Sequence, residues 1–347
     1  MRVVVAGATG AIGVPLVQDL VDHGHEVIGV TRSAQSAADN GDIWAGAIVA
    51  NVLDAESLRS AARSIRADAV IHQLTALARP PIRYRDLDQT NDLRIRGTRH
   101  LLELAAVVGA TRFVTQSFFG GYGYGDHGEA ILTEEDHFAP PGRSAGLERA
   151  LAAMRSGEQQ VLGSTDVEGV ALRYGLFYGS GRPLDPVLKM LRRRQFPIPR
   201  GGGGTLSYVY VPDAARATVA ALERGRAGQA YNVCDDEPVP WGTFISAMAK
   251  TFGTPPPFRV ASWMLRAAPY AHAFMTSTIR LSNQRAKEEL DWSPSAPTYR
   301  EGLRLAREEI LAQSRDLRAY AMPGNGYDGA NEGKSGGGQD RPVEPIT

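Results

Sequence analysis

The chain opens with MRVVVAGATGAIG at residues 1–13. Val3–Val5 form an apolar run too short to alternate, which is typical of a strand buried on both faces of a parallel sheet. Gly7, Gly10 and Gly13 follow at three-residue spacing, and an apolar helical pattern starts directly after them. The order strand, glycine turn, helix predicts an α/β fold that begins with a βαβ unit.

Each glycine of this turn has a physical role in holding a pyrophosphate. Gly7 permits the tight turn, Gly10 lets the backbone approach phosphate oxygens, and Gly13 allows the helix to pack closely on the strand. The helix amino terminus adds free N–H groups and the positive end of its dipole. The segment therefore predicts a dinucleotide-binding site.

Composition excludes several classes of function. The 347 residues include 38 basic and 38 acidic side chains, so the chain lacks the charge excess typical of nucleic-acid or membrane-surface binding. No apolar stretch approaches the roughly 20 residues needed to cross a bilayer. The first apolar run ends at Gly7, so we expect no signal peptide. Cys234 is the only cysteine, which excludes an intrachain disulfide and predicts a cytoplasmic protein.

Strand-like and helix-like segments alternate along the chain. Further strands are predicted at residues 27–31, 47–49, 69–74, 112–116, 169–173, 208–211 and 230–233. Helices are predicted at residues 14–23, 55–64, 94–108, 147–162 and 213–223, with Asp54 as the N-cap of the second. This alternation predicts a Rossmann-type doubly wound parallel sheet with right-handed crossovers.

Changes in composition divide the chain. We expect a dinucleotide-binding domain at residues 1–178, completed by residues 205–233. The proline- and glycine-rich stretch 179–204 and residues 234–322 would form a smaller substrate-binding domain. Residues 323–347 carry few large apolar side chains and predict a disordered tail.

Motifs spread from residue 1 to about residue 305 resemble the extended branch of the short-chain dehydrogenase/reductase family, which includes epimerases and dehydratases. The motifs are GATGAIG at 7–13, VIHQL at 70–74, GTRHLL at 97–102, RFVTQS at 112–117, LRYGLFYG at 172–179, YVYVPDAA at 208–215, YNV at 231–233 and LDWSP at 290–294. The resemblance implies a bound NAD(P) and a small carboxy-terminal domain that covers a small-molecule substrate. Relatives pair through two helices, which here match residues 94–108 and 147–162, and this predicts a homodimer.

The end of the second strand bears on the choice of cofactor. An acidic residue there would bind the ribose 2′-hydroxyl of NAD, whereas arginine accommodates the 2′-phosphate of NADP. Arg32 and Ser33 occupy this place, and no carboxylate occurs before Asp39, which favours NADP over NAD. Asn51 stands where the family usually has an aspartate near the adenine. The full predicted cofactor set is Gly7, Thr9, Gly10, Ala11, Ile12, Gly13, Arg32, Ser33, Asn51, Val52, Leu74, Thr75, Gln116 and Tyr174.

The family's standard proton-transfer groups are missing from the sequence. They are a Ser or Thr after the fifth strand and Tyr-x-x-x-Lys on the next helix, where lysine lowers the tyrosine pKa. Aligning the glutamate that follows this lysine on Glu158 puts Ala150 and Met154 at the dyad positions, and aligning it on Glu148 finds no dyad either. Phe118 holds the usual hydroxyl position. No tyrosine in the chain is followed four residues later by lysine.

Four residues near the fifth strand are the first candidate substitutes: Ser117, Tyr122, Tyr124 and His127. His137 and Tyr178 are further possibilities. For the tyrosines, a packed ring with its hydroxyl on a backbone carbonyl is the competing interpretation, and for His127 an exposed loop position. The histidines show no metal-binding spacing. The carboxylate run at residues 235–237, beside two prolines, predicts a solvated turn.

Three functions therefore remain open. The first is an NADP-dependent oxidoreductase with a non-standard proton donor. The second is a redox-neutral isomerase, dehydratase or cyclase on the same fold. The third is a non-catalytic sensor of the cofactor. Fold alone does not distinguish them.

Overall fold

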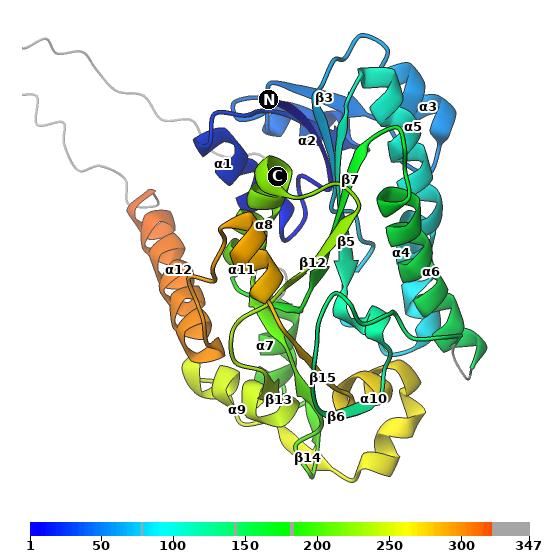
Figure 1. The fold of residues 1–347 in the computed structure, drawn as a ribbon. Coiled ribbons are helices and arrows are strands. Elements are labelled where there is room, and N and C mark those ends of the chain that lie inside the picture. The colour runs from blue at the N-terminus through cyan, green and yellow to red at the C-terminus, as the bar shows by residue number, and fades with distance from the viewer. Residues whose placement is uncertain (78, 142–143, 181–183, 321–347) are drawn as a thin grey trace, which may run out of the picture. The chain divides into compact units, whose positions relative to one another are not determined.

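A seven-stranded, all-parallel sheet runs through the protein in the order β12-β7-β5-β4-β1-β2-β3 (Figure 1). The computed structural model describes residues 1–77, 79–141, 144–180 and 184–320. The strands are β1 (Arg2–Ala6), β2 (Glu26–Thr31), β3 (Gly46–Val49), β4 (Ala69–His72), β5 (Arg112–Phe118), β7 (Glu168–Tyr174) and β12 (Gln229–Val233). The predicted doubly wound fold is confirmed.

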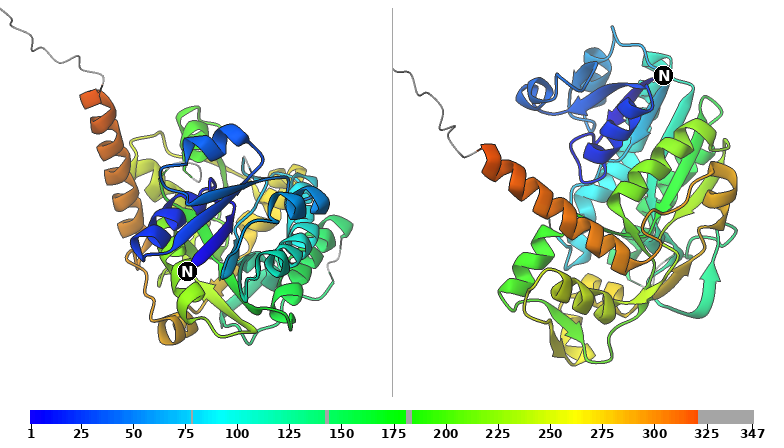
Figure 2. Two further views of the ribbon diagram at one scale, coloured as in Figure 1. Left: turned by 90° about the horizontal axis from the view of Figure 1, so that it is seen from above. Right: turned by 90° about the vertical axis from the view of Figure 1, so that its left-hand side faces the viewer.

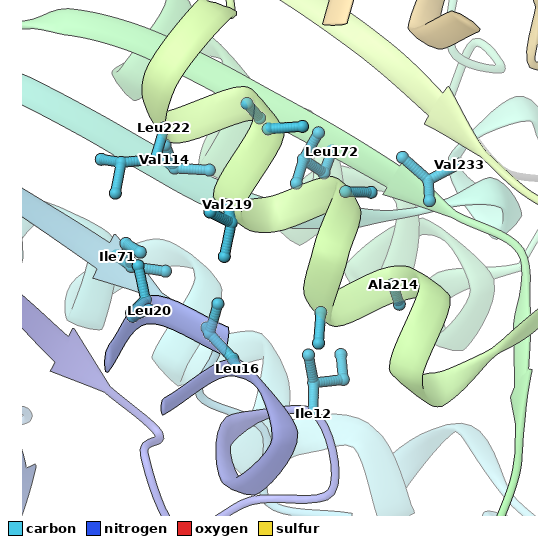
Figure 3. Close-up of a cluster of buried hydrophobic side chains, with 14 of the residues drawn as sticks. Ile12, Leu16, Leu20, Ile71, Val114, Leu172, Ala214, Val219, Leu222 and Val233 are labelled. Atoms are coloured by element: carbon cyan, nitrogen blue, oxygen red, sulfur yellow. The ribbon is translucent and has the colours of Figure 1, made fainter. Parts of the chain in front are cut away.

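Helices cover both faces of this sheet. One face carries α1 (Gly13–Asp22), α8 (Val211–Arg224) and α11 (Gln284–Leu290), and Figure 3 shows the apolar side chains of α1 and α8 meeting those of the strands. The other face carries α3 (Ala55–Ala61), α5 (Thr98–Val108) and α6 (Ala145–Leu162). Asp54 caps α3, as predicted, by accepting the Ser57 N–H at 3.1 Å.

The first crossover depends on a backbone contact that only glycine permits. A Cβ at Gly13 would lie 2.0 Å from the Gly7 carbonyl oxygen, so α1 packs directly on the turn. Gly7 itself has φ of +100°, a conformation that L side chains rarely adopt. The tight turn predicted at Gly7 and the close helix packing predicted at Gly13 are therefore both present in the structure.

The helix predicted at residues 94–108 is interrupted. It starts earlier, as α4 (Asp88–Asp92), passes through a single π-helical turn, η2 (Leu93–Gly97), and continues as α5. A π turn inserts one extra residue and often marks a functional site. The sequence contains no signal for it.

Smaller elements gather beyond the end of β5 (Figure 1), and in the right-hand view of Figure 2 they lie at the end opposite the amino terminus. A four-stranded sheet has the order β13-β10-β15-β6, and two further strand pairs are β11-β8 and β14-β9. The strands are β6 (Asp126–Leu132), β8 (Leu176–Tyr178), β9 (Pro197–Pro199), β10 (Thr205–Leu206), β11 (Tyr208–Tyr210), β13 (Val239–Pro240), β14 (Phe258–Val260) and β15 (Thr278–Leu281). The remaining helices are α2 (Ala34–Asp39), α7 (Asp185–Arg192), α9 (Trp241–Thr251), α10 (Pro269–Thr276), α12 (Tyr299–Tyr320), η1 (Tyr84–Leu87), η3 (Phe119–Tyr122) and η4 (Ser262–Ala267).

Residues 1–310 form one compact unit. The division into cofactor and substrate domains stays a prediction, and the predicted tail at 323–347 lies outside the described residues. Across the described ranges, no helix has the length and apolar character needed to cross a membrane.

The solvated turn predicted at residues 235–237 is wrong for its first residue. Asp235 is buried, and its carboxylate accepts a hydrogen bond from the Tyr178 hydroxyl at 2.6 Å. Burial raises the pKa of Asp235 well above its ordinary value. The prolines that indicated a turn lie just beyond this buried residue.

Candidate active site at the carboxyl ends of the strands

The glycine turn after β1 has the geometry of an anion cradle. Gly10 N–H donates to the Gly7 carbonyl at 2.8 Å, which closes the turn. No side chain caps the amino terminus of α1, and its first turn holds no acidic residue. The free N–H groups and the helix dipole there favour a phosphate. A side chain at Gly7 would collide with the backbone of Gln73, so the turn requires glycine at this position. The turn and the helix amino terminus together suit a cofactor pyrophosphate.

The residues expected around the adenine lie at the ends of β2 and β3. Arg32 is exposed and makes no hydrogen bond or ion pair with any described residue. Ser33 caps α2 by accepting the Ser36 N–H at 3.2 Å. The Asn51 side-chain oxygen accepts the Leu53 N–H, which leaves its amide N–H₂ free for a ligand. This arrangement leaves the Arg32 guanidinium available for an anion.

Several predicted residues meet near the ends of β4 and β5. Gln116 donates to the Leu74 carbonyl, and Thr75 is exposed beside it. Tyr174 is fully buried, with its hydroxyl 2.7 Å from Thr218 Oγ1. Ser117 differs from them because its buried Oγ has no hydrogen-bond partner among the described residues. A buried hydroxyl without a hydrogen-bond partner destabilises the folded protein unless a ligand supplies that partner.

Tyr122 lies in a buried polar network. Its hydroxyl is 2.8 Å from Arg173 Nη1, 2.9 Å from Asn232 Oδ1 and 3.0 Å from the Thr133 carbonyl. Burial raises the pKa of Tyr122 to about 12. The phenol therefore stays protonated near neutral pH, and its hydrogen bonds are already taken up by protein groups.

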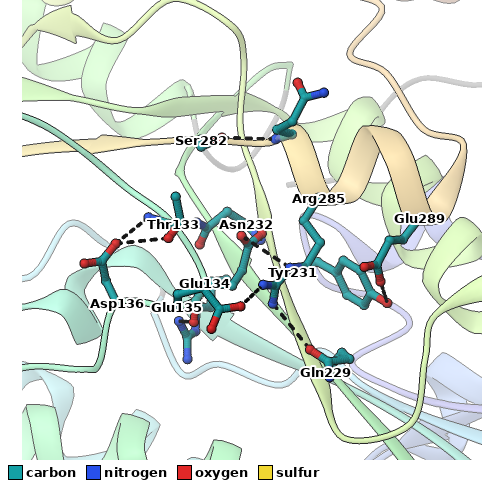
Figure 4. Close-up of polar contacts among 12 residues, drawn as sticks. Thr133, Glu134, Glu135, Asp136, Gln229, Tyr231, Asn232, Ser282, Arg285 and Glu289 are labelled. Carbon is teal, nitrogen blue, oxygen red and sulfur yellow. Dashed lines mark hydrogen bonds and ion pairs between the residues drawn. The ribbon is translucent and has the colours of Figure 1, made fainter.

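A buried ion pair anchors that network. Arg173 on β7 donates from Nη2 to Glu158 Oε2 on α6 at 2.9 Å, and both side chains are nearly inaccessible. Burial alone would lower the Arg173 pKa, but the hydrogen bonds and charge of Glu158 raise it. Figure 4 shows the neighbouring contacts, in which Glu134 accepts the Asn232 N–H at 2.6 Å.

Tyr124 belongs to a different group, the tyrosine cluster of Tyr84, Tyr124 and Tyr270. The Tyr124 and Tyr270 hydroxyls are 3.1 Å apart, and the Tyr84 and Tyr270 rings meet edge to face at 5.6 Å. Burial raises the pKa of both Tyr124 and Tyr270. The structure thus separates Tyr122 and Tyr124, which the sequence places in one loop. Tyr84 and Tyr270 carried no signal in the sequence.

His127 lies on β6 rather than in a loop. Its Nε2 is 3.1 Å from the Gly123 carbonyl oxygen. This contact ties the start of β6 to the glycine-rich segment before it. A ring bound to backbone in this way positions the segment.

The two positions on α6 that the sequence assigns to the dyad are apolar in the structure. Ala150 and Met154 are both buried and pack with Leu87 and the tyrosine cluster. Phe118, at the end of β5, contacts the same group. The surface that α6 presents at the carboxyl end of β5 is therefore hydrocarbon and aromatic. Within the described ranges, no group of three or more His, Cys, Asp or Glu residues is arranged to hold a metal ion.

Comparison with known proteins identifies relatives of this arrangement. A model of the NAD-dependent epimerase/dehydratase family matches residues 3–234. A 3-diazoavenalumate denitrifying reductase from a Streptomyces species is 37% identical over 316 residues, covering 87% of this chain and 99% of that protein. A 2-alkyl-3-oxoalkanoate reductase from Stenotrophomonas maltophilia is 25% identical over 270 residues, covering 74% and 77%.

A solved structure confirms the fold. The UDP-glucose 4-epimerase of Thermus thermophilus, in complex with NAD, superposes with a TM-score of 0.69 at 24% sequence identity. The match covers 90% of this chain and 99% of that one. The relatives together support a nicotinamide cofactor.

His72, at the end of β4, should make stability depend on pH. Its ring is 1% exposed, Nδ1 accepts the Leu74 N–H at 3.2 Å, and burial lowers the pKa to about 4. In the unfolded chain the pKa is about 6.5, so between these values only the unfolded state takes up the proton. Stability should fall by about 2 kcal/mol from pH 7 to pH 5 through this group.

Urea unfolding at the two pH values measures this effect. We expect His72→Gln to flatten the pH dependence, whereas His137→Gln, at an exposed histidine, should leave it intact. An undiminished pH dependence in His72→Gln would assign the effect to other groups.

Proposed function

Because the chain belongs to the NAD-dependent epimerase/dehydratase family, we propose that it is an NADP-dependent reductase of a small, diazo-bearing organic substrate. Family membership makes it an NAD(P)-dependent enzyme. The finer proposal is that the substrate carbon accepts hydride and releases dinitrogen. The observation that carries it is the buried apolar packing of Ala150 and Met154 at the positions that the sequence assigns to the proton-transfer dyad.

The possible hydride acceptors differ in whether their reduction also requires a proton. The bound cofactor supplies a hydride, that is, two electrons and one hydrogen. A carbonyl that accepts it also needs a proton on oxygen. A diazonium carbon accepts the hydride pair into a C–H bond while its C–N bond breaks, and both C–N electrons leave on dinitrogen. Cation plus hydride gives a neutral arene and N₂, with no proton required.

The 37% identical relative is named for such a reaction, the reductive denitrification of 3-diazoavenalumate. Its similarity extends over 87% of this chain and nearly all of that protein. The name alone does not transfer a substrate, but the same chemistry accounts for the missing dyad. The two arguments are independent and favour the same class of acceptor.

The candidate residues then take substrate-binding and positioning roles. We propose that Ser117 and Tyr124 contact the substrate, because the Ser117 hydroxyl lacks a partner among the described residues and Tyr124 packs in the same cluster as Met154. Tyr122 and His127, bound to other protein groups, would position the segment between β5 and β6. The glycine turn would hold the pyrophosphate.

Arg32 should determine the preference for NADP. Its guanidinium has no carboxylate partner in the part of the chain that the structure describes and would pair with the 2′-phosphate. A charge-assisted contact of this kind contributes roughly 1.5–3 kcal/mol, so Arg32→Ala should remove about tenfold or more of the preference for NADPH over NADH. Calorimetric titration of both cofactors measures it, with Arg63→Ala as an exposed arginine control. Tighter NADH binding by the wild type would contradict the proposal.

Isotope transfer tests the reaction. With 4-diazoniobenzoate as probe and NADPH deuterated at C4, we expect benzoate carrying one ring deuterium, together with N₂. Unlabelled NADPH in D₂O should give no ring deuterium. Gly10→Val, which obstructs the pyrophosphate turn, controls for reaction in free solution.

Three outcomes would reject the proposal. Ring deuterium from D₂O would indicate a proton donor. Reduction of a 3-oxo acid alone would indicate a carbonyl reductase, whose donor would be sought among Ser117, Tyr122, Tyr124 and His127. Turnover without NADPH oxidation would indicate a redox-neutral isomerase, dehydratase or cyclase.

We also propose a homodimer formed through α5 and α6. Both helices lie on one face of the sheet, and Ile95, just before α5, has an apolar side chain that is 38% exposed. Light scattering at micromolar concentration should give twice the chain mass of 37.3 kDa. A monomeric mass would rule the dimer out.

A further inference from the structure

Arg94 stands in the π turn η2 and faces α6. A Cβ at Gly157 of α6 would lie 3.9 Å from the Arg94 Cβ and 3.4 Å from its carbonyl oxygen. Gly157 therefore allows the π turn to approach the helix closely. It follows Met154 by one helical turn, so the Arg94 side chain starts beside the hydrocarbon surface described above.

The guanidinium of Arg94 has no protein acceptor. No hydrogen bond or ion pair joins it to any residue that the structure describes. By comparison, Arg173 and Arg155 nearby are both paired with glutamates. Burial lowers the pKa of Arg94, and its charge acts on Tyr124 and Tyr270. A partly buried cation with five unused donors is unfavourable until an anion arrives.

The tyrosine cluster adds a further donor. Of the two hydroxyls that are 3.1 Å apart, one donates to the other, which leaves the second hydrogen free. Two other polar groups near this face, Asn91 Oδ1 and Ser117 Oγ, are buried without a partner among the described residues. Asn91 precedes Arg94 by three residues along the same helix, so both lie on neighbouring parts of its surface.

We propose that Arg94, together with the one free hydroxyl hydrogen of the Tyr124–Tyr270 pair, binds the carboxylate of the substrate, whose aromatic ring packs against the tyrosine cluster. The substrate is then an aromatic carboxylic acid. The inference rests on the proposed function, because it takes the carboxylate that Arg94 binds to be part of the same molecule that accepts the hydride. Arginine forms short, charge-assisted hydrogen bonds with both oxygens of a carboxylate. Edge-to-face tyrosine rings provide the matching aromatic contact.

Binding of an unreactive acid tests the assignment without relying on turnover. Cinnamate and its neutral analogue cinnamamide are titrated calorimetrically into the NADP⁺-loaded protein. We expect Arg94→Gln to weaken cinnamate binding by roughly 10- to 100-fold and to leave cinnamamide binding unchanged. Arg94→Lys should retain part of the affinity, because it keeps the charge without the planar fork. Tyr270→Phe should give a smaller loss, and Arg63→Gln none.

Thermal unfolding of each variant and its affinity for NADP⁺ complete the test. Native-like melting with unchanged NADP⁺ affinity in Arg94→Gln supports the proposal. A parallel loss of NADP⁺ affinity would assign Arg94 to a cofactor phosphate and overturn it. Absence of cinnamate binding in the wild type, or equal cinnamate affinity in Arg94→Gln, would also overturn it. Selective cinnamate binding without reduction of 4-diazoniobenzoate would instead reject the proposed reaction and keep the carboxylate site.

Discussion

The buried ion pair between Arg173 and Glu158 organises the end of the molecule where β5 and β7 finish. It joins β7 to α6, and Arg173 also lies over the rings of Tyr122 and Phe138 at 5.1 and 4.3 Å. Removing one partner of such a pair leaves an unpaired buried charge, which typically costs about 3–5 kcal/mol. Because Glu158 is thus held to the sheet, the first half of α6 keeps its place opposite the end of β5. That placement brings hydrocarbon side chains, rather than a phenol and an ammonium, to the site.

Local patterns account for what the sequence predicts well. The glycine turn and the apolar strands of the central sheet are encoded within a few neighbouring residues, so their positions follow from spacing alone. Strands of two or three residues such as β10 and β13 are different, because they exist only through pairing with distant segments. Asp235 shows the same limit. Its burial depends on Tyr178, 57 residues earlier, which no neighbouring proline reveals.

The candidate site also has some residues that neighbouring sequence reveals and others that only the folded structure reveals. Sequence reasoning proposes the glycine turn, Arg32 and Ser117 as site residues, because each stands next to a recognisable strand. It does not find Arg94, which occurs in an ordinary helical stretch, Leu-Arg-Ile-Arg, whose π turn has no sequence signature. Nor does it reveal that Ser117 lacks a partner among the described residues, since an unsatisfied hydroxyl is a property of the whole surrounding structure.

A hydrocarbon lining suits the proposed acceptor for a second reason. A diazonium carbon reacts with any nucleophile, and water competes with hydride by giving a phenol and dinitrogen. Side chains such as Met154 and Phe118 offer water no hydrogen bonds, so they favour its exclusion near the reacting carbon. A Tyr-Lys dyad would keep polar groups and their hydration at the same place. The absence of the dyad that the sequence predicts would then serve the proposed reaction in two ways, because the acceptor would need no proton and the apolar side chains would disfavour water.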